Sequence, residues 1–323
     1  MKNKVPIELI KVIEGQSHFC LLSHADPDGD CVGSELALAH YLRRLGKQVG
    51  LFSPGPFDRP EIRDLAPQFS SRIDPKILTG RPVIIVLDCS SIERIGDLSA
   101  DIEGLTTIVI DHHSSGRKFG DIEYIDATAP SVTLLVQNVI EQMGNEVDEE
   151  EARWIFFGFC TDTGFFRHID SGGDAVFESV ARLNRAGATP KQIYRMIYGG
   201  RALEARLLLG ILLARTEERL GGKVLLTYET AADKQRYGKD NRDSDSLYQY
   251  LQTVVGCEVV VFIREERESF CSVGLRSNAH VDVGAIAKGF GGGGHVRAAG
   301  FELEATRRQI EQQLLAVLAD AFT

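Results

Sequence analysis

Positions 83 to 88 hold the stretch Val83-Ile84-Ile85-Val86-Leu87-Asp88, an apolar, β-branched run that ends in a carboxylate. Two other apolar runs end in the same way: residues 19–22 precede the acidic segment 24–30, and residues 107–110 precede Asp111-His112-His113. Short apolar runs bounded by turn residues are typical of buried parallel strands. Ligands of open α/β sheets bind at the carboxyl ends of the strands. The three acidic clusters are therefore expected to meet in space.

Such a meeting would crowd Asp28, Asp30, Asp88 and Asp111 into one crevice. Several carboxylates at one place are strongly unfavourable unless protons or cations neutralise them. Two divalent metal ions would do so. The neighbouring histidines favour Mn, Fe, Co or Zn over Ca or a single Mg, because imidazole nitrogen suits the transition metals.

The composition describes an ordinary soluble protein of 323 residues, 43% hydrophobic and 25% charged, which is long enough for two moderate domains. The longest strongly apolar stretch, Leu207 to Ala214, is too short to span a bilayer, and residues 1–14 lack the apolar core of a signal peptide. We therefore expect a cytoplasmic protein with no membrane contact.

The six cysteines are scattered, so neither a disulfide framework nor a zinc knuckle is indicated. The formal net charge of -10 argues against a protein that coats long nucleic acid, because such binding depends on cationic side chains that displace counterions from phosphates. A short nucleotide remains an acceptable substrate, since it needs only a few local cations.

The order of expected elements predicts an α/β protein with two domains. Strands and helices alternate in the first half, which is typical of a doubly wound, mostly parallel sheet. The pattern changes near residues 195–220, where a long helix over 203–219 is expected as a connector, and the remainder is typical of a smaller α+β domain. The predicted boundaries are 1–195 for a metal-binding catalytic domain, 196–220 for a helical linker and 221–323 for a substrate-binding domain.

His24, Asp28 and Asp30 form the pattern H-x3-D-x-D in the loop after the first strand. Carboxylates two residues apart on an extended segment project to the same side. Pro27 and Gly29 stiffen and sharpen the turn, so the ligands need not be ordered on binding. A solvated Asp-Gly turn with capping acids is the alternative for this motif alone; the later clusters favour a metal site.

The other candidate residues also have structural alternatives. Asp88 alone could be a helix cap, whereas two successive histidines at a strand end, His112 and His113, can divide metal ligation from contact with a substrate phosphate. Asp162 follows a helix too apolar for the surface, and we favour a ligand over a cap. Arg167 could contact an anionic substrate; His168 could share that contact, although a structural role is favoured.

The most unusual feature of the C-terminal part is the glycine run 291–294 followed by His295. Glycines permit close approach of backbone to a ligand, and successive N–H groups can form an anion-binding nest. His295 with Arg276 and Arg297 could complement a phosphate or a base. A flexible loop is the alternative.

These motifs together resemble the DHH phosphoesterases. The first-half clusters are similar to the four motifs of that family. Leu275-Arg276-Ser277, the segment 281–287 and Gly292-Gly293-Gly294-His295 with 298–300 resemble the DHHA1 domain that follows them. Length and motif order are most similar to the NrnA-type oligoribonuclease (nanoRNase) and pAp phosphatase branch, rather than to the larger RecJ exonucleases.

The resemblance implies a role for each matching residue. One metal would be held by His24, Asp28 and Asp88, and the other by Asp30, Asp88, His112 and Asp162, with Asp88 as the bridge. His113 would face the scissile phosphate, and Asp111 would orient its neighbours. The second domain would hold the nucleotide through Arg276, Ser277, Gly292, Gly293, Gly294 and His295. Manganese is the expected ion, with Mg²⁺ and Co²⁺ as alternatives. The roles of Asp26, Asp126 and Ser131 stay open.

The functional expectation is a two-metal hydrolase in which an activated hydroxide attacks phosphorus. It would release 5′-mononucleotides from very short RNA and remove the 3′-phosphate of pAp, without acting on long double-stranded nucleic acid. A phosphodiesterase for cyclic dinucleotides or pGpG, an exopolyphosphatase and a non-catalytic nucleotide sensor are the alternatives, and a homodimer is left open. A Rossmann dehydrogenase is disfavoured, because aspartates stand where G-x-G-x-x-G would be needed.

Overall fold

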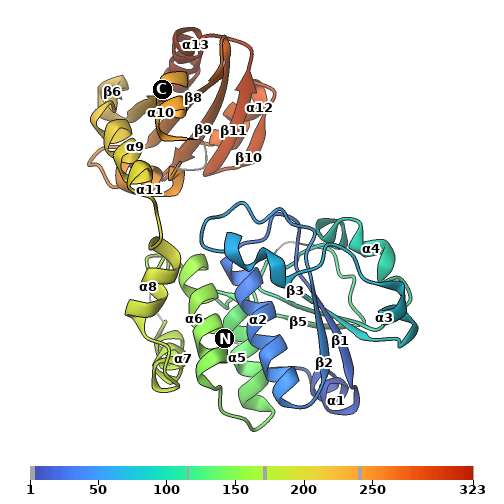
Figure 1. Cartoon of the computed structure of the whole chain (residues 1–323). Helices are drawn as coiled ribbons and strands as arrows, with labels where there is room; N and C mark the ends of the chain where they lie inside the picture. Colours follow the sequence, from blue (N-terminus) through green and yellow to red (C-terminus); the bar gives the residue numbers. More distant parts are fainter. Residues whose placement is uncertain (1–3, 115, 170–172, 239–241, 323) are drawn as a thin grey trace. The chain divides into compact units, whose positions relative to one another are not determined.

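The computed structural model describes residues 4–114, 116–169, 173–238 and 242–322. The chain divides into two compact units, Met1–Gly200 and Arg201–Thr323 (Figure 1). Within the described parts, no helix is both long and apolar enough to cross a membrane.

The first unit is built on a five-stranded sheet in the order β2-β1-β3-β4-β5, and every neighbouring pair is parallel. The strands are β1 (His18–Leu22), β2 (Gln48–Phe52), β3 (Val83–Leu87), β4 (Thr107–Asp111) and β5 (Ile122–Ile125). The three apolar runs of the sequence are thus β1, β3 and β4, adjacent and parallel. The predicted doubly wound α/β fold is confirmed.

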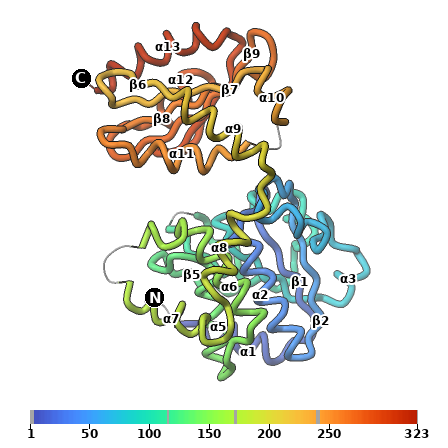
Figure 2. The backbone as a smooth tube through the Cα atoms, turned by 60° about the vertical axis from the view of Figure 1, so that its left-hand side comes forward, coloured from blue at the N-terminus to red at the C-terminus, as the bar shows by residue number. Residues whose placement is uncertain are grey.

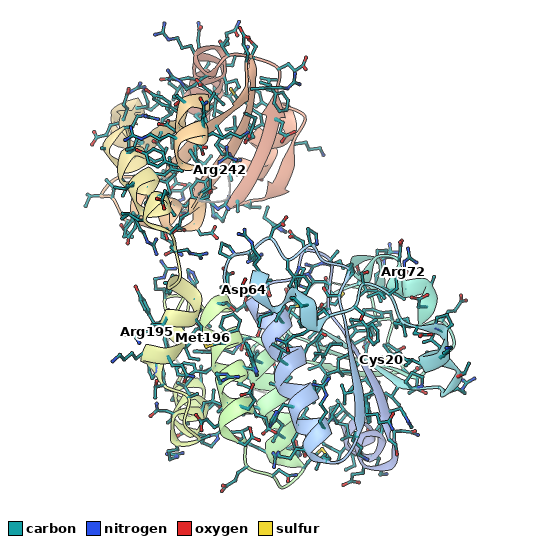
Figure 3. All side chains as sticks on the ribbon, in the orientation of Figure 1. Cys20, Asp64, Arg72, Arg195, Met196 and Arg242 are labelled. Carbon is teal, nitrogen blue, oxygen red and sulfur yellow. The ribbon has the colours of Figure 1, made fainter. Side chains whose placement is uncertain are left out.

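Both faces of this sheet are covered, as parallel sheets require. Leu21, Ile85 and Ile110 pack into the core beneath three helices, α2 (Gly29–Arg44), α5 (Val132–Gln142) and α6 (Glu149–Asp162). The alternate residues Cys20 and Val86 point to the other face. That face is covered by η2 (Ile92–Ile95) and α4 (Leu98–Asp101); Cys20 is labelled in Figure 3. The remaining elements of this unit are α1 (Ile7–Gly15), η1 (Arg63–Gln68), α3 (Pro75–Thr79), α7 (Asp174–Arg185) and α8 (Pro190–Tyr198).

Helices α2 and α6 approach closely because glycines stand at their crossing. A Cβ atom on Gly33 would lie 2.7 Å from the Trp154 carbonyl oxygen, and one on Gly158 would lie 3.0 Å from the Cα of Asp30. Side chains cannot be accommodated at such separations, so the glycines permit this packing. The contact brings the start of α2, with Asp30, beside the last turn of α6, which ends in Asp162.

The second unit has a mixed six-stranded sheet in the order β10-β11-β9-β8-β7-β6. Only β7 and β8 are parallel neighbours. Helices of this unit cover both faces of the sheet, α9 to α11 on one and α12 with α13 on the other (Figure 2). The elements are α9 (Leu203–Ala214), β6 (Glu217–Arg219), η3 (Leu220–Gly222), β7 (Val224–Glu229), α10 (Ala231–Tyr237), α11 (Ser244–Gln252), β8 (Val259–Arg267), β9 (Phe270–Ser277), α12 (Val283–Gly289), β10 (Gly293–His295), β11 (Ala298–Leu303) and α13 (Arg307–Asp320).

One expectation and one alternative from the sequence differ from this arrangement. The helix expected over 203–219 ends at Ala214, and its last residues form β6, which pairs with β7. The turn between those strands contains Gly221 and Gly222 at φ 67° and 86°, a left-handed conformation that favours glycine. Helix α9 packs against other residues of the second unit through Leu208 and Leu212. The glycine run is also no free loop, because Gly293–His295 is an edge strand paired with β11.

Candidate metal centre

The loops that follow β1, β3 and β4 meet at Asp88. Its carboxylate oxygens lie 3.8 Å from Nε2 of His24, 3.6 Å from Nε2 of His112 and 3.6 Å from Nδ1 of His113. The Nε2 atom of His112 also lies 3.5 Å from Asp162 at the end of α6. Atoms that share one ion at about 2.1 Å must themselves be separated by roughly 3 to 4 Å, and these separations fit that requirement.

Asp88 is the most unusual residue of the site. Its side chain is almost fully buried, and its Oδ1 atom has no hydrogen-bond partner among the described residues. Its backbone has φ 56°, a sparsely populated conformation for a non-glycine residue that costs on the order of 1 to 3 kcal/mol and is common at functional sites. A buried carboxylate oxygen without a partner is unfavourable in the protein alone. A cation bound at this oxygen would remove that penalty.

Asp28 and Asp30 are both held at helix starts. Asp28 caps α2 by accepting the backbone N–H groups of Asp30 and Cys31 at 3.1 Å. Asp30 is fully buried and accepts the N–H groups of Val132 and Thr133, at 2.6 and 3.0 Å, at the start of α5. Hydrogen bonds from a helix N-terminus favour a carboxylate. They fix the Asp30 oxygens before any ligand arrives.

The pKa values report the crowding of negative charge. Burial, with repulsion from Asp88, Asp162 and Asp28, raises the pKa of Asp30 well above its usual range, against the hydrogen bond from Val132. Burial and the repulsion of Asp88 and Asp28 raise the pKa of Asp162 to about 6, against the attraction of His112. In the absence of cations these carboxyl groups therefore resist ionisation, as expected for acids that share one crevice.

The rings of His24 and His112 are oriented by backbone carbonyls. Nδ1 of His24 contacts the Ala25 carbonyl oxygen at 2.8 Å, and Nδ1 of His112 contacts that of Ala129 at 3.1 Å. The N–H that each ring places on Nδ1 leaves Nε2 as the free lone pair, which is the form that ligates metals. Burial lowers the pKa of His24, but its contacts with Asp88, Ala25 and Asp28 raise it more.

The loop 126–131 supports two of these side chains. The backbone N–H of Asp126 donates to the Asp111 carbonyl oxygen, and that of Ala129 to the Asp126 carbonyl oxygen, which places the Ala129 carbonyl beside His112. Ser131 is the N-cap of α5, the helix that holds Asp30. The sequence left Asp126 and Ser131 without a role; the structure places both in this supporting loop.

His113 and Asp111 form a pair beside Asp88. Oδ1 of Asp111 accepts a hydrogen bond from Nδ1 of His113 at 2.7 Å. This bond raises the pKa of His113, against burial, and it helps to lower the pKa of Asp111 although burial alone would raise it. The His113 side chain is 37% exposed, so its second nitrogen is available for a substrate.

The ligand atoms gather in three overlapping groups within the first unit, in each of which they lie within 4.8 Å of one another. Together the groups contain all six predicted metal ligands and His113. Their ligand atoms are imidazole nitrogens and carboxylate oxygens, a combination that suits Mn²⁺ and related ions. The groups are His24-Asp28-Asp88, Asp88-His112-His113 and Asp30-His112-Asp162. A further group, His40-Asp148-Glu151, lies elsewhere on α2 and α6 and is already engaged by Arg44.

Arg167 and His168 are exposed in the turn that follows Asp162. The Nε atom of Arg167 donates to the Gly164 carbonyl oxygen at 2.8 Å. Phe165 and Phe166 between them have φ 57° and 74°, so this turn is held in an unusual conformation by the packing of its aromatic rings. The Arg167 side chain is exposed, five residues after Asp162 in the chain.

The remaining predicted substrate residues lie in the second unit. His295 and the glycines 293 and 294 are exposed, and Arg276 is partly exposed at the end of β9. Ser277 is buried and donates its hydroxyl to the Val281 carbonyl oxygen at 2.7 Å, so its hydroxyl serves the internal structure of this loop.

Two family models match the chain, one within each unit. Residues 18–159 match the model described as "DHH family, N-terminal domain", and residues 221–322 match the DHHA1 domain. The chain is 29% identical over 304 residues to the bifunctional oligoribonuclease and PAP phosphatase NrnA of Thermus thermophilus, a match that covers 94% of this chain and 89% of that protein. It is 24% identical over 298 residues to the protein of the same name from Bacillus subtilis, covering 91% of each.

A solved structure extends the similarity to the whole chain. An exopolyphosphatase-related protein from Bacteroides fragilis superposes with a TM-score of 0.83 at 25% sequence identity, covering 97% of this chain and 96% of that one. The matched part includes both units described above.

Proposed function

This chain belongs to the DHH family of phosphoesterases, and we propose that it hydrolyses very short RNA to 5′-mononucleotides and removes the 3′-phosphate of pAp. One observation carries the proposal: the buried Asp88 carboxylate, with an oxygen that no described residue satisfies, is surrounded by three histidines. The activities for which the Thermus and Bacillus relatives are named suggest the substrate class.

The proposed ligands divide into two sets that share Asp88. The first set is His24, Asp28 and Asp88, whose ligand atoms form one group. The second set is Asp30, His112 and Asp162, which form another group, together with Asp88, whose Oδ1 atom lies 3.6 Å from Nε2 of His112. Two divalent cations, with Mn²⁺ as the favoured ion, would neutralise the carboxylates and supply a hydroxide for in-line attack on phosphorus. The raised pKa values of Asp30 and Asp162 support this assignment, because bound cations would offset the burial and the mutual repulsion that disfavour the ionised carboxylates.

His113 is proposed to contact the phosphoryl group. Its Nδ1 is occupied by Asp111, so a protonated ring presents Nε2–H to the substrate side. A positioned cationic donor of this kind stabilises charge that develops on phosphoryl oxygens in the transition state. Asp111 holds that ring in place and favours its protonated form. Arg167, exposed in the turn after Asp162, would contact the same anionic substrate.

One active centre accounts for both activities. In each case a bond between phosphorus and the 3′ oxygen of a ribose is cleaved, and that oxygen leaves. Polyphosphate is the second candidate substrate, because the Bacteroides relative of known structure is described as exopolyphosphatase-related. Polyphosphate has the same charged phosphoryl groups but no ribose or base.

A substrate panel tests the proposal. The purified protein is incubated with pAp, pApA, a 24-nucleotide RNA, pGpG, a cyclic dinucleotide and polyphosphate, each with Mn²⁺ and with chelator, and products are separated by chromatography. We expect Mn²⁺-dependent release of AMP from pApA and of phosphate from pAp, with much slower turnover of the long strand. Preferential hydrolysis of polyphosphate, or turnover that survives chelation, would refute the proposal.

A further inference from the structure

An open hollow borders the candidate metal centre within the first unit. It has a volume of about 580 Å³ and is lined by residues of the two loops that follow β3 and β4, namely Ser90, Ser91, Glu93, Gly116 and Arg117. The same two loops supply Asp88 and the pair His112-His113. The hollow therefore lies next to the place where a scissile phosphate would bind.

Backbone contacts hold the two loops together. The N–H of Arg117 donates to the Ser90 carbonyl oxygen at 3.1 Å. A Cβ atom on Gly116 would overlap that same oxygen, so only glycine allows the loops to approach so closely. Because Ser90 comes two residues after Asp88, this contact fixes the position of Arg117 relative to the centre.

A second arginine, Arg94, is attached to both sides of this region. Its carbonyl oxygen accepts the N–H of Ala25 at 2.7 Å, and its own N–H donates to the Ser91 carbonyl oxygen at 3.2 Å. The hydrogen bond with Asp111 raises the pKa of His113, and burial and the nearby positive charge of Arg94 both oppose this rise. Arg94 therefore lies near the hollow and near His113.

The guanidinium groups of Arg94 and Arg117 are available for a ligand. Both side chains are exposed, and neither forms an ion pair or a side-chain hydrogen bond with the residues that the structure describes. The next cation along the chain differs in this respect, because Nζ of Lys118 lies 3.1 Å from a carboxylate oxygen of Glu123.

Acidic groups near these arginines do not cancel their charge. Glu93 lines the same hollow and attracts Arg117, but its carboxylate is fully exposed and is hydrogen-bonded first to its own backbone and to Ser91, which lowers its pKa. In the metal centre, two divalent cations would balance the four ligand carboxylates, and Asp111 is already paired with His113. Two arginines against one acid then leave an excess of positive charge at the hollow.

The chemistry of the hollow suits a phosphate. Guanidinium groups and serine hydroxyls donate hydrogen bonds to phosphate oxygens. When the 3′ oxygen of one ribose leaves, the phosphoryl group at the centre stays attached to the nucleotide on its 3′ side. Donors that hold this retained nucleotide keep the phosphoryl group in place during cleavage. The retained nucleotide carries a further phosphate only in substrates of three or more nucleotides.

We propose that Arg117 and Arg94, with the hydroxyl groups of Ser90 and Ser91, bind the substrate phosphate that lies one nucleotide beyond the cleaved phosphate, on its 3′ side. We call these four residues the downstream phosphate subsite. The inference rests on the proposed function for the identity of the substrate. The subsite favours a trinucleotide over a dinucleotide, whereas pAp, whose cleaved phosphate is terminal, does not reach it.

Steady-state turnover with Mn²⁺ tests the subsite on pAp, pApA and pApApA as substrates of the full chain. We expect the unmodified protein to cleave pApApA with a higher kcat/KM than pApA. Loss of one charged donor to phosphate weakens binding by about 10-fold. Arg117→Gln should therefore lower kcat/KM for pApApA by about that factor and leave the values for pAp and pApA within about twofold.

Two further variants control for charge. Lys118→Gln removes the same charge from the next residue, whose side chain is already engaged by Glu123, and it should leave turnover of all three substrates unchanged. Glu93→Gln removes the acid that attracts Arg117, and it should raise kcat/KM for pApApA by about twofold. Lys118→Gln with the same loss as Arg117→Gln would show a general effect of charge and would overturn the proposal.

Equilibrium binding gives a second readout that does not depend on turnover. Isothermal titration calorimetry with Ca²⁺ in place of Mn²⁺ measures the affinity for pApA and pApApA at several salt concentrations, with chromatography to confirm intact ligands. Each contact with a single-stranded phosphate contributes about 0.7 to the slope of log affinity against log salt. Arg117→Gln should reduce the slope for pApApA by about that amount and leave the slope for pApA unchanged.

The outcomes separate this inference from the proposed function. If Arg117→Gln left pApApA unchanged, or lowered turnover of pAp as much as that of pApApA, the subsite would be refuted and the proposed function would stand. If the unmodified chain hydrolysed none of the three nucleotides but bound pApApA more tightly than pApA through Arg117, the proposed function would be refuted and the subsite would stand.

Discussion

The Nδ1 atom of His113 lies 2.7 Å from Oδ1 of Asp111, and the same oxygen accepts the backbone N–H groups of His112 and His113. One buried carboxylate oxygen therefore holds three donors from the residues that follow it. This arrangement fixes the direction of the His113 ring and leaves its Nε2 as the only free nitrogen.

Replacement of Asp111 by Asn should separate the role of Asp111 in orienting the His113 ring from the role of its negative charge. The amide can still occupy the position, but it cannot stabilise a protonated His113 as the carboxylate does. We expect kcat for pApA to fall by about 10- to 100-fold, with KM changed less than about threefold. Steady-state kinetics with Mn²⁺ check this. Asp101→Asn, a change on α4 away from these contacts, is the control, and an effect of Asp111→Asn on KM alone would contradict the assignment.

Removal of a proposed metal ligand should abolish turnover without unfolding the chain. His112→Ala deletes the ring that faces both Asp88 and Asp162, and we expect activity to fall by at least about 10³-fold. The matched control is His18→Ala, because His18 is exposed at the start of β1, the end of the strand opposite His24. Circular dichroism should show both variants folded. Near-normal rates for His112→Ala with Mn²⁺ present would show that this ring is not a ligand.

Metal binding should appear in stability as well as in activity. Ligands that bind only the folded state stabilise it by about 2.7 kcal/mol at a concentration of 100 times Kd, so Mn²⁺ should raise the Tm of the chelated protein. Asp88→Asn should lose this response. In chelator the same variant should be at least as stable as the unmodified protein, because a neutral amide replaces a buried carboxylate that faces other acids.

Differential scanning calorimetry with and without Mn²⁺ measures both effects. A full Mn²⁺ response in Asp88→Asn would show that Asp88 is not central to the site. A large loss of stability in chelator would indicate a structural role for its charge.

Acid should destabilise the second unit through Glu266. Burial would raise the pKa of this residue, but hydrogen bonds from Lys234, Arg242 and Ser272 outweigh burial and lower the pKa to about 2. A lowered pKa means that the stabilisation is complete above the unfolded value of about 4.3 and is lost as the pH falls toward 2. Glu266→Gln should therefore lower the free energy of unfolding at pH 7 by on the order of 2 kcal/mol.

The same variant should flatten the loss of stability between pH 4.5 and pH 2, measured by urea unfolding at each pH. Glu304→Gln is the control, because Glu304 is exposed and forms only a surface ion pair with Arg267. If Glu266→Gln and the unmodified protein lost stability in parallel over this range, the ion-pair network would not be the source of the acid sensitivity.

The contact between Gly274 and Tyr248 can be tested by a double replacement. A methyl group on Gly274 would lie 2.0 Å from the Tyr248 hydroxyl oxygen, so Gly274→Ala should cost about 1 to 3 kcal/mol of stability through overpacking. Tyr248→Phe removes that oxygen and should recover part of the loss. Gly293→Ala, where a Cβ meets no atom within 4 Å, should be nearly neutral. A Gly274→Ala variant as stable as Gly293→Ala would contradict the described packing.

Sequence reasoning located the elements well where the hydrophobic pattern was strong. The runs before Asp88 and Asp111 are buried strands that end where predicted, because short β-branched segments bounded by polar residues have few alternatives. The extension of the helix at 203–214 to residue 219 was wrong, since Glu217–Arg219 has no pattern of its own and becomes a strand only by pairing with β7. The same reason explains the glycine strand β10, whose pairing with β11 no local signal announces.

By itself, the sequence determined which side chains follow the parallel strands. It therefore predicted that Asp28, Asp88 and His112 would lie together at one edge of a sheet. That inference needs only the alternation of strands and helices. Only the tertiary structure decided how they are held: the unsatisfied oxygen of Asp88, the α5 N-terminus at Asp30 and the carbonyl oxygens behind the histidine rings. It also revealed the close approach of the Tyr248 hydroxyl to Gly274. That approach depends on the packing of α11 against β9 and on the absence of a side chain at Gly274, and neither property can be read from local residue patterns.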